Sequence, residues 1–172
     1  MMNNLNNNLA IKSALDRMVD VYQKKPYIAQ STSAITGVVE DGLACRITDG
    51  NLTVTADLPE VMGGNDTGPT PGFYARAGLA GCVSMGIKMM GARAGHNFRS
   101  VRVHIENDFD DRAMYGLCDT TAAPVETRVG IEIDSDLDDS ELRAFVEDVL
   151  EHDTWFVALR DSQSVKTQIN GS

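Results

Sequence analysis

The chain has 172 residues, of which 42% are hydrophobic and 23% charged, a composition that fits one ordinary globular domain. Its 25 Asp and Glu against 15 Lys and Arg give a formal net charge of −10, which argues against nucleic acid or an anionic membrane as the main partner. Three cysteines cannot all pair within one chain, and the apolar content is too high for a disulfide-dependent miniprotein. The Asn-rich start does not look like a secretory signal, so we expect a cytoplasmic protein.

The N-terminal residues predict a helix that stands apart from the rest of the chain. Residues 1–8 are polar and are expected to fray, whereas apolar residues recur at helical spacing over residues 9–24. Pro26 ends this helix. We therefore assign residues 1–26 to a tail and an extension helix, and residues 27–172 to a single domain.

An antiparallel meander is predicted next. Its three runs rich in β-forming residues are 27–40, 43–48 and 51–58. Asp41-Gly42 and Asp49-Gly50 separate these runs, and Asp-Gly is a strong hairpin-turn dipeptide.

A loop rich in glycine and proline, residues 59–71, leads into the longest predicted helix, residues 72–94. Thr70 suits the N-cap, Pro71 the first turn and Gly95 the C-cap. Three basic residues interrupt its apolar sequence and exclude a membrane span: Arg76, Lys88 and Arg93. Its small residues fit a buried helix that another backbone approaches closely: Ala77, Gly78, Gly81 and Gly86.

The C-terminal half predicts further strands and two short helices. The strands expected are 99–107, 113–118, 125–134 and 165–169, and the helices are 137–151 and 155–160. Asp138 and Glu141 form a plausible capping box for the first helix, and Asp153 or Thr154 would cap the second. Because no βαβ unit repeats, the fold class is α+β.

Cys82 is the strongest candidate for a catalytic residue. A cysteine is a nucleophile only as the thiolate, which needs a nearby cation or a helix N-terminus. Cys82 lies too far into its own helix to gain much from the helix dipole, so an arginine from elsewhere in the fold would have to activate it. The alternative is a buried, inert thiol, and Cys45 and Cys118 are expected to be structural.

No metal or cofactor is expected from the remaining motifs. His96, His104 and His152 lack the spacing of metal ligands and are expected at the surface. The Asp residues over 134–138 have the spacing of the first ligands of an EF-hand loop. The residues at the later positions of that loop are not those that calcium binding requires. Residues 132–153 carry −9 of the net charge and are expected to form a solvated face.

The three glycines of the loop leave two readings open. Gly63, Gly64 and Gly68 lie just before a helix N-terminus and would present backbone N–H groups to an anion. A tight turn into the helix explains them equally well.

Two motifs resemble the OsmC/Ohr family of osmotically inducible and organic hydroperoxide resistance proteins. They are Pro59-Glu-x-x-Gly63-Gly64-x-x-x-Gly68-Pro69-x-Pro71 and, about ten residues later, Leu79-Ala-Gly-Cys82. With the order of elements, the resemblance spans roughly residues 30–170. It implies an OsmC-like α+β fold with antiparallel sheets around a long central helix. It also implies an intertwined homodimer with active sites at the subunit interface.

The resemblance further implies reduction of organic hydroperoxides by a cysteine that a second cysteine then captures as a disulfide. Cys82 matches the attacking cysteine, and Arg46 is the nearest candidate for the arginine that activates it. Gly72 stands where a glutamate often follows the proline, and Asp153 occupies the place of the second cysteine. An external thiol reductant or Cys45 would then have to resolve the oxidised thiol.

Three functions follow as hypotheses. The first is a divergent thiol-dependent peroxidase that uses Cys82, and the second is a non-catalytic protein that binds a small apolar or thiol-reactive ligand at the dimer interface. The third is an interaction subunit that uses the acidic residues 132–153 as its contact surface.

Overall fold

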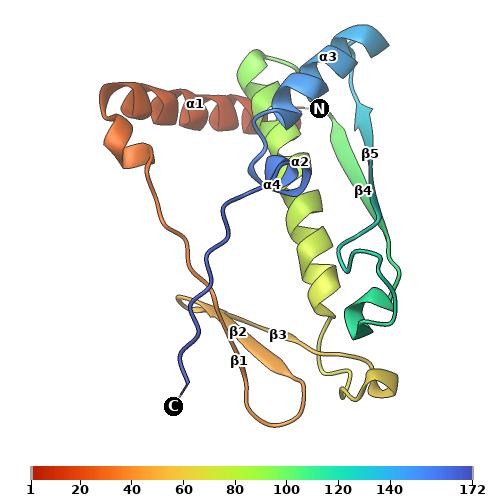
Figure 1. Ribbon diagram of the computed structural model, residues 1–172. Helices are drawn as coiled ribbons and strands as arrows, with labels where there is room; N and C mark the ends of the chain where they lie inside the picture. The colour runs from red at the N-terminus through yellow and green to blue at the C-terminus, as the bar shows by residue number, and fades with distance from the viewer. Residues whose placement is uncertain (1, 172) are drawn as a thin grey trace. The chain divides into compact units, whose positions relative to one another are not determined.

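The computed structural model describes residues 2–171, and their helices and strands are labelled in Figure 1. The chain forms two compact units. One comprises Ser13–Gly78, and the other comprises the residues up to Lys12 together with those from Leu79 onward. The boundaries fall within the two long helices α1 (Met2–Lys24) and α2 (Pro71–Ala94).

The unit Ser13–Gly78 contains the predicted meander. Strands β1 (Thr36–Val39), β2 (Cys45–Asp49) and β3 (Leu52–Ala56) form an antiparallel sheet in that order. Gly42 and Gly50 in its two turns have φ of 69° and 55°, a region that glycine enters without steric cost. The two Asp-Gly turns are therefore confirmed.

The first predicted strand is much shorter than expected. Of residues 27–40, the strand keeps only Thr36–Val39, and Pro26–Ala29 form a 3₁₀ turn (η1) instead. Thr36 pairs with Thr48, and only Asp49 remains in β2 beyond that pair, so the register allows β1 at most one more paired residue. The register of the hairpin thus sets the length of β1.

The second unit is built on a two-stranded antiparallel sheet of β4 (Ser100–Asp108) and β5 (Glu126–Asp134). Side chains alternate strictly along both strands, so one face is apolar and half-buried and the other is polar and exposed. The apolar face packs on a core whose buried residues are Leu79, Val83, Ile87, Phe98 and Val149. These residues come from α2, the turn after it and α3 (Asp139–Leu150), which Figure 1 shows beside the strands.

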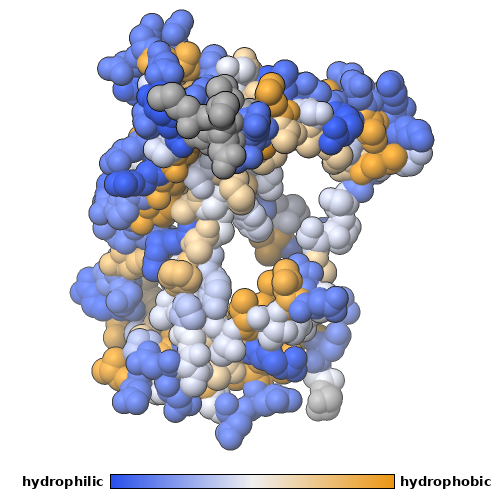
Figure 2. All heavy atoms as spheres, turned by 180° about the vertical axis from the view of Figure 1, so that it is seen from behind, coloured by the Kyte–Doolittle hydropathy of each residue, from blue (hydrophilic) through white to orange (hydrophobic). Residues whose placement is uncertain are grey.

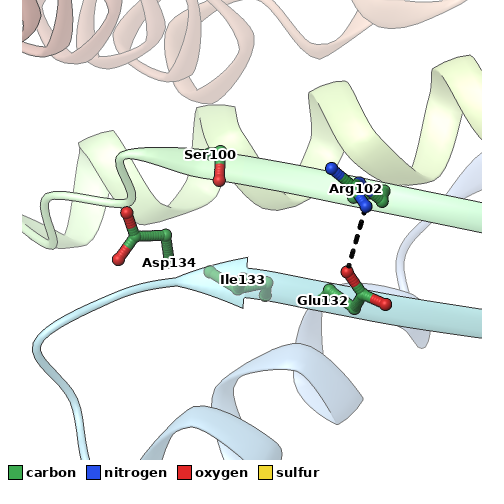
Figure 3. A pocket seen from close by; sticks show the side chains of 5 residues that line it. All are labelled: Ser100, Arg102, Glu132, Ile133 and Asp134. Carbon is green, nitrogen blue, oxygen red and sulfur yellow. Dashed lines mark ion pairs between the residues drawn. The ribbon is translucent and has the colours of Figure 1, made fainter.

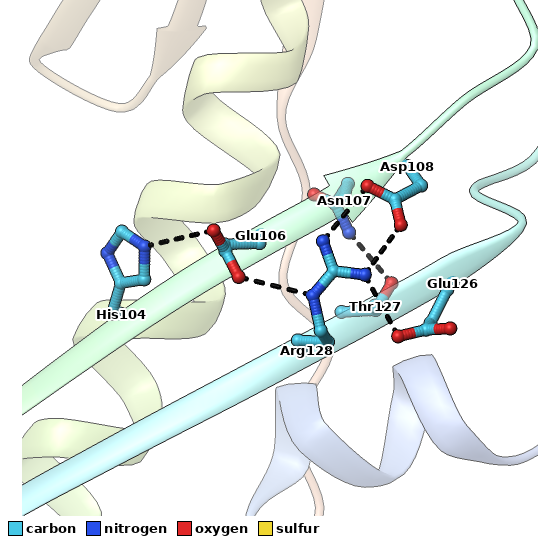
Figure 4. A network of polar contacts seen from close by, with 7 residues as sticks. All are labelled: His104, Glu106, Asn107, Asp108, Glu126, Thr127 and Arg128. Atoms are coloured by element: carbon cyan, nitrogen blue, oxygen red, sulfur yellow. Dashed lines mark hydrogen bonds and ion pairs between the residues drawn. The ribbon is translucent and has the colours of Figure 1, made fainter.

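The polar face of β4 and β5 holds a network of charges around Arg128 (Figure 4). The guanidinium of Arg128 lies 2.5 Å from a carboxylate oxygen of Asp108, 2.9 Å from one of Glu126 and 3.2 Å from one of Glu106. This contact lowers the pKa of Asp108. Because all four side chains are exposed, the network orders the face more than it stabilises the fold.

Helix α1 begins at Met2, whereas residues 1–8 were expected to fray. Asn8 is only 8% exposed, and its amide donates a hydrogen bond of 3.0 Å to the side chain of Asn97. Lys12 donates a hydrogen bond of 2.9 Å to the carbonyl of Arg93 near the end of α2, where a cation suits the helix dipole. Such contacts with residues distant in sequence hold the start of the helix, and local polarity does not reveal them.

Two further strand predictions were wrong. Residues 113–118 contain a 3₁₀ turn (η3, Ala113–Tyr115) that ends at Gly116 with φ of 67°. Residues 165–169 have no regular structure. No strand of the described residues 2–171 pairs with them, and an unpaired β segment is not stable alone.

Both C-terminal helices are confirmed with their caps. Asp138 accepts hydrogen bonds of 2.9 Å from the backbone N–H groups of Ser140 and Glu141 at the start of α3. Asp153 likewise accepts one of 2.9 Å from Phe156 at the start of α4 (Thr154–Arg160). An aspartate at the N-cap satisfies backbone donors that the helix itself leaves unpaired.

Helix α2 is buried along one face rather than all round. Leu79, Val83, Ile87 and Gly91 recur every four residues and are buried, whereas Met85 is 61% exposed. Figure 2 shows hydrophobic atoms exposed among hydrophilic ones in the view from behind. Within residues 2–171, no helix has the length and apolar character needed to cross a membrane.

Candidate active site

The loop that precedes α2 is organised around the buried carboxylate of Asp57, which is 1% exposed. This carboxylate accepts hydrogen bonds from the backbone N–H groups of Leu58, Asn65 and Thr67 and a bond of 2.7 Å from the Thr67 hydroxyl. These donors favour the charged form and lower the pKa of Asp57 to about 2. The loop therefore directs its N–H groups at an anion that belongs to the chain itself.

Close packing explains two glycines of this loop. A methyl group on Gly64 would lie 1.9 Å from the carbonyl oxygen of Leu58, and one on Gly68 would lie 2.3 Å from that of Thr55. Gly63 has a φ of 86°, which suits glycine. Of the two readings of these glycines, the tight turn is the one the structure shows.

The start of α2 is fixed within the same unit. The N–H of Phe73 donates a hydrogen bond of 3.4 Å to the Thr70 hydroxyl, and Pro71 is the first helical residue, as predicted. The hydroxyl of Tyr74 donates a hydrogen bond of 2.8 Å to the carbonyl of Thr55 on β3. These hydrogen bonds join loop, sheet and helix start within the unit Ser13–Gly78.

Cys82 lies on α2 next to Val83, which is fully buried, and its own side chain is half-buried. The first backbone N–H groups of α4, from Thr154 and Trp155, act on its sulfur in the direction that lowers the pKa of the thiol. The contribution of a helix start, which α2 does not provide at this position, therefore comes from a different helix. These donors favour the thiolate.

Asp153 is the second ionisable group at the thiol. Its carboxylate acts on the thiol of Cys82 and raises the thiol pKa, although the two residues are far apart in sequence. It is 6% exposed, and one carboxylate oxygen, Oδ1, accepts the N–H of Phe156. The sequence predicts Asp153 as a helix cap, and the resemblance places it at the position of the family's second cysteine. Its interaction with Cys82 was not predicted.

Gly86 leaves room for the carboxylate of Asp153. It lies one turn after Cys82 on the same side of α2. A methyl group at Gly86 would stand 3.1 Å from Oδ2 of Asp153 and 4.0 Å from Val149. The small residue at this position therefore lets Asp153 reach α2 beside the thiol.

Two opposing effects act on the proton of Cys82. Burial is the larger one and disfavours the thiolate, and the hydrogen bond and charge of Asp153 act in the same direction. The N–H groups of Trp155 and Thr154 act against them. The net result within this unit is a raised pKa of the Cys82 thiol. A cation near the sulfur would reverse it.

Arg46 and Cys45 lie on β2 in the unit Ser13–Gly78. Arg46 is exposed and pairs in register with Val38 and Thr55. Cys45 is half-buried, and a methyl group on Gly37 of β1 would lie 3.1 Å from its sulfur. Whether either residue serves Cys82 stays a prediction.

The other candidates do not form a site. Cys118 is a free thiol that forms a hydrogen bond with Asp110. His104 is exposed as expected, whereas His96 is half-buried, with its ring 5.1 Å from that of Phe145. Among residues 2–171, no group of three or more His, Cys, Asp or Glu side chains lies close enough together to hold a metal ion.

Much of the acidic segment 132–153 is occupied by contacts within its own unit. Arg99 lies 2.5 Å from Asp134 and 2.7 Å from Asp136, which lowers the pKa of Asp134. Other carboxylates of the segment pair with arginines or cap helices: Glu132, Glu151, Asp138 and Asp153. The expected solvated face is nevertheless confirmed, because the acidic side chains of the segment are exposed except for that of Asp153.

A shallow pocket lies at one end of the polar face of β4 and β5 (Figure 3). Ser100, Arg102, Glu132, Ile133 and Asp134 line it. Arg102 and Glu132 are 3.6 Å apart and point toward each other, and both are exposed. The pocket does not include Cys82; Arg102 and Glu132 pair with each other, and Asp134 pairs with Arg99.

The comparisons with known proteins agree with this architecture. The family model of the OsmC-like proteins matches residues 63–169. A crystal structure of an OsmC-like protein from Mycoplasma pneumoniae is similar with a TM-score of 0.65 at 17% identity, over 76% of this chain and 89% of that one. No curated protein matches the chain.

Two further solved structures are similar in fold. An organic hydroperoxide resistance protein from Legionella pneumophila has a TM-score of 0.51 at 19% identity, over 76% of this chain and 90% of that one. The organic hydroperoxide resistance protein of Bacillus subtilis has a TM-score of 0.51 at 18% identity, over 76% and 91%. The predicted α+β class and OsmC-like fold are confirmed.

Proposed function

Because the chain belongs to the OsmC-like protein family, we propose that it is a thiol-dependent peroxidase that reduces organic hydroperoxides through Cys82. The observation that carries this proposal is the setting of the thiol. Cys82 is half-buried on α2, and the backbone N–H groups at the start of α4 favour its thiolate. Two proteins of similar fold are organic hydroperoxide resistance proteins, which supports the substrate class.

The first chemical step is a two-electron oxidation of the thiol. The thiolate attacks the distal oxygen of the hydroperoxide, a sulfur–oxygen bond forms and the oxygen–oxygen bond breaks. Its electron pair leaves on the alkoxide, which takes a proton and departs as the alcohol. Cys82 is left as a sulfenic acid.

Regeneration of the Cys82 thiol then requires a different thiol, because position 153 does not provide one. Asp153 stands where the family's second cysteine is expected, and a carboxylate cannot form a disulfide. A small-molecule thiol attacks the sulfenic sulfur, releases water and forms a mixed disulfide, and a second thiol frees Cys82 as the reductant becomes a disulfide. Cys45 is the alternative resolving thiol.

Arg46 completes the proposal as the activating cation. Burial and Asp153 raise the pKa of Cys82, so a reaction at neutral pH needs a compensating positive charge. An arginine remains charged at any working pH and suits this role. The reduced cytoplasm would supply the thiols that regenerate the site.

A peroxidase assay with the Cys82→Ser variant tests the proposal. With excess dithiol or monothiol reductant, wild-type protein consumes an alkyl hydroperoxide and the variant does not. Cys118→Ser, which removes a free thiol from the same unit, is the matched control and retains activity. Equal consumption by wild type and Cys82→Ser with every reductant would end the proposal.

The second candidate is a protein that binds a small apolar or thiol-reactive ligand without turnover. The raised pKa of the Cys82 thiol and the aspartate at position 153 favour it, because both work against a catalytic cycle. It predicts a saturable rise in melting temperature with ligand and no hydroperoxide consumption. Catalytic consumption that depends on Cys82 would exclude it.

We also propose that the protein works as a homodimer. Helix α2 carries exposed apolar and small residues: Phe73, Ala77, Gly78, Met85 and Met89. A second copy would cover such residues, as the resemblance implies. Sedimentation at micromolar concentration should give a dimer that Met85→Glu dissociates, whereas a wild-type monomer would refute the proposal.

A further inference from the structure

The carboxylate of Asp153 is held between two helices at the thiol of Cys82. Its Oδ1 accepts the N–H of Phe156 at 2.9 Å, which fixes the side chain at the start of α4. Its Oδ2 points toward α2, where Gly86 leaves the space that a side chain would fill. The residue is 6% exposed, so bulk water hardly reaches the group.

Among the described residues of its unit, no ion pair joins this carboxylate to a cation. Five arginines of the unit pair with other acids: Arg99, Arg102, Arg112, Arg128 and Arg160. The carboxylate acts on the thiol of Cys82, which lies on α2 one turn before Gly86, the residue that Oδ2 of Asp153 approaches. A buried carboxylate with a thiol as neighbour is placed to accept a proton from it.

We propose that Asp153 is the proton carrier of the Cys82 reaction, a role that rests on the proposed peroxidase function. The carboxylate accepts the thiol proton, and the resulting thiolate attacks the distal peroxide oxygen. As the oxygen–oxygen bond breaks, the carboxylic acid returns the same proton to the departing alkoxide. The products are the alcohol and the sulfenic acid, and Asp153 ends as the carboxylate with which it began.

The burial of the site makes this transfer useful. An alkoxide is a poor leaving group unless it is protonated as it departs, and a site shielded from water offers few other donors. The proton that Asp153 removes from the nucleophile is the one that the leaving group needs. The same carboxylate that hinders spontaneous ionisation of the thiol thereby assists the reaction with a bound hydroperoxide.

Asp153→Asn separates this role from a purely electrostatic one. Asparagine retains the helix cap because its side-chain oxygen can accept the N–H of Phe156, but it can neither take nor return the proton. Alkylation of Cys82 by iodoacetamide should become faster, by about tenfold for each unit by which the thiol pKa falls without the negative charge. Reduction of an alkyl hydroperoxide should instead fall by about 100-fold, the usual scale of general acid–base catalysis.

The leaving group provides a second test. Peroxyacetic acid releases a carboxylate that needs no proton, so Asp153→Asn should reduce it at least as fast as the wild type does. Asp138→Asn, which alters the capping aspartate of α3 in the same unit, is the matched control and should leave all three rates unchanged. If Asp153→Asn reduces alkyl hydroperoxide as fast as wild type, or loses both peroxides equally, the inference is refuted.

A measurement on the unaltered protein keeps the test independent of the variant's folding. Wild-type reduction of alkyl hydroperoxide should show a larger solvent deuterium isotope effect than reduction of peroxyacetic acid, and equal effects would overturn the inference. If the wild type reduces neither peroxide, the proposed function itself fails. If it reduces both but Asp153 proves dispensable, the peroxidase proposal stands and the proton carrier does not.

Discussion

Gly91 on α2 faces the ring of Phe98, and this contact packs the helix that carries Cys82 against the core of its own unit. A methyl group on Gly91 would lie 2.5 Å from two ring carbons of Phe98, whereas carbon atoms in contact prefer about 3.5–4.0 Å. The ring has little room to retreat. It is 1% exposed and packs against the rings of His96 and Phe145 at 5.8 and 5.5 Å.

The effect of Gly91→Ala follows from two opposing contributions to the free energy of unfolding. Replacing a mid-helix glycine by alanine stabilises a helix by about 0.5–1 kcal/mol. Overpacking a well-filled core costs about 1–3 kcal/mol. The net destabilisation should therefore lie between about 0 and 2.5 kcal/mol, which lowers the melting temperature of a chain of this size by up to about 10 °C.

Thermal unfolding monitored by circular dichroism measures this change, and a double-mutant cycle with Phe98→Leu assigns its cause. Once the ring is gone, Gly91→Ala should no longer destabilise, so the two substitutions should not be additive. A rise in melting temperature for Gly91→Ala alone, or simple additivity, would refute the packing described for this helix.

Arg46→Ala should move the pH profile of Cys82 alkylation about 1 unit or more to higher pH, while Arg46→Lys moves it less, because loss of a nearby cation raises the pKa of a thiol; an unchanged profile would exclude Arg46 as activator. Asp57 has a pKa lowered from 3.8 to about 2, so its contribution to stability is present above pH 3.8 and disappears as the pH falls toward 2. The gap in melting temperature between wild type and Asp57→Asn should therefore narrow over that interval, and a constant gap would contradict the assigned hydrogen bonds. Asp153→Cys should form a disulfide between Cys82 and the introduced thiol when hydroperoxide is added, seen as the loss of two titratable thiols. Asp138→Cys is its control and should lose none by that route.

Local signals in the sequence were sufficient for much of the fold. The Asp-Gly turns, the alternation along β4 and β5 and the capping aspartates Asp138 and Asp153 depend on residues adjacent in the chain, and all are confirmed. The early start of α1 was missed because its support comes from Asn97 and Arg93, which are distant in sequence.

The candidate site was predictable in its nucleophile but not in its surroundings. Cys82 could be found because a motif precedes it, and position 153 because a helix cap marks it. Their proximity depends on how α4 packs on α2, which no local pattern encodes. Asp57 was missed for a related reason, since its partners are mostly backbone N–H groups, which have no signature in side-chain sequence.

The most direct test of the central claim is a single-turnover experiment on the Cys82 sulfur. Wild-type protein without reductant is mixed with one equivalent of an alkyl hydroperoxide, the sulfenic acid is trapped with dimedone, and the modified residue is identified by mass spectrometry. We expect one molecule of alcohol to be released for each trapped sulfenic acid, and the dimedone adduct to be on Cys82. Alcohol formation without modification of Cys82, or an adduct on Cys45 or Cys118 alone, would contradict it.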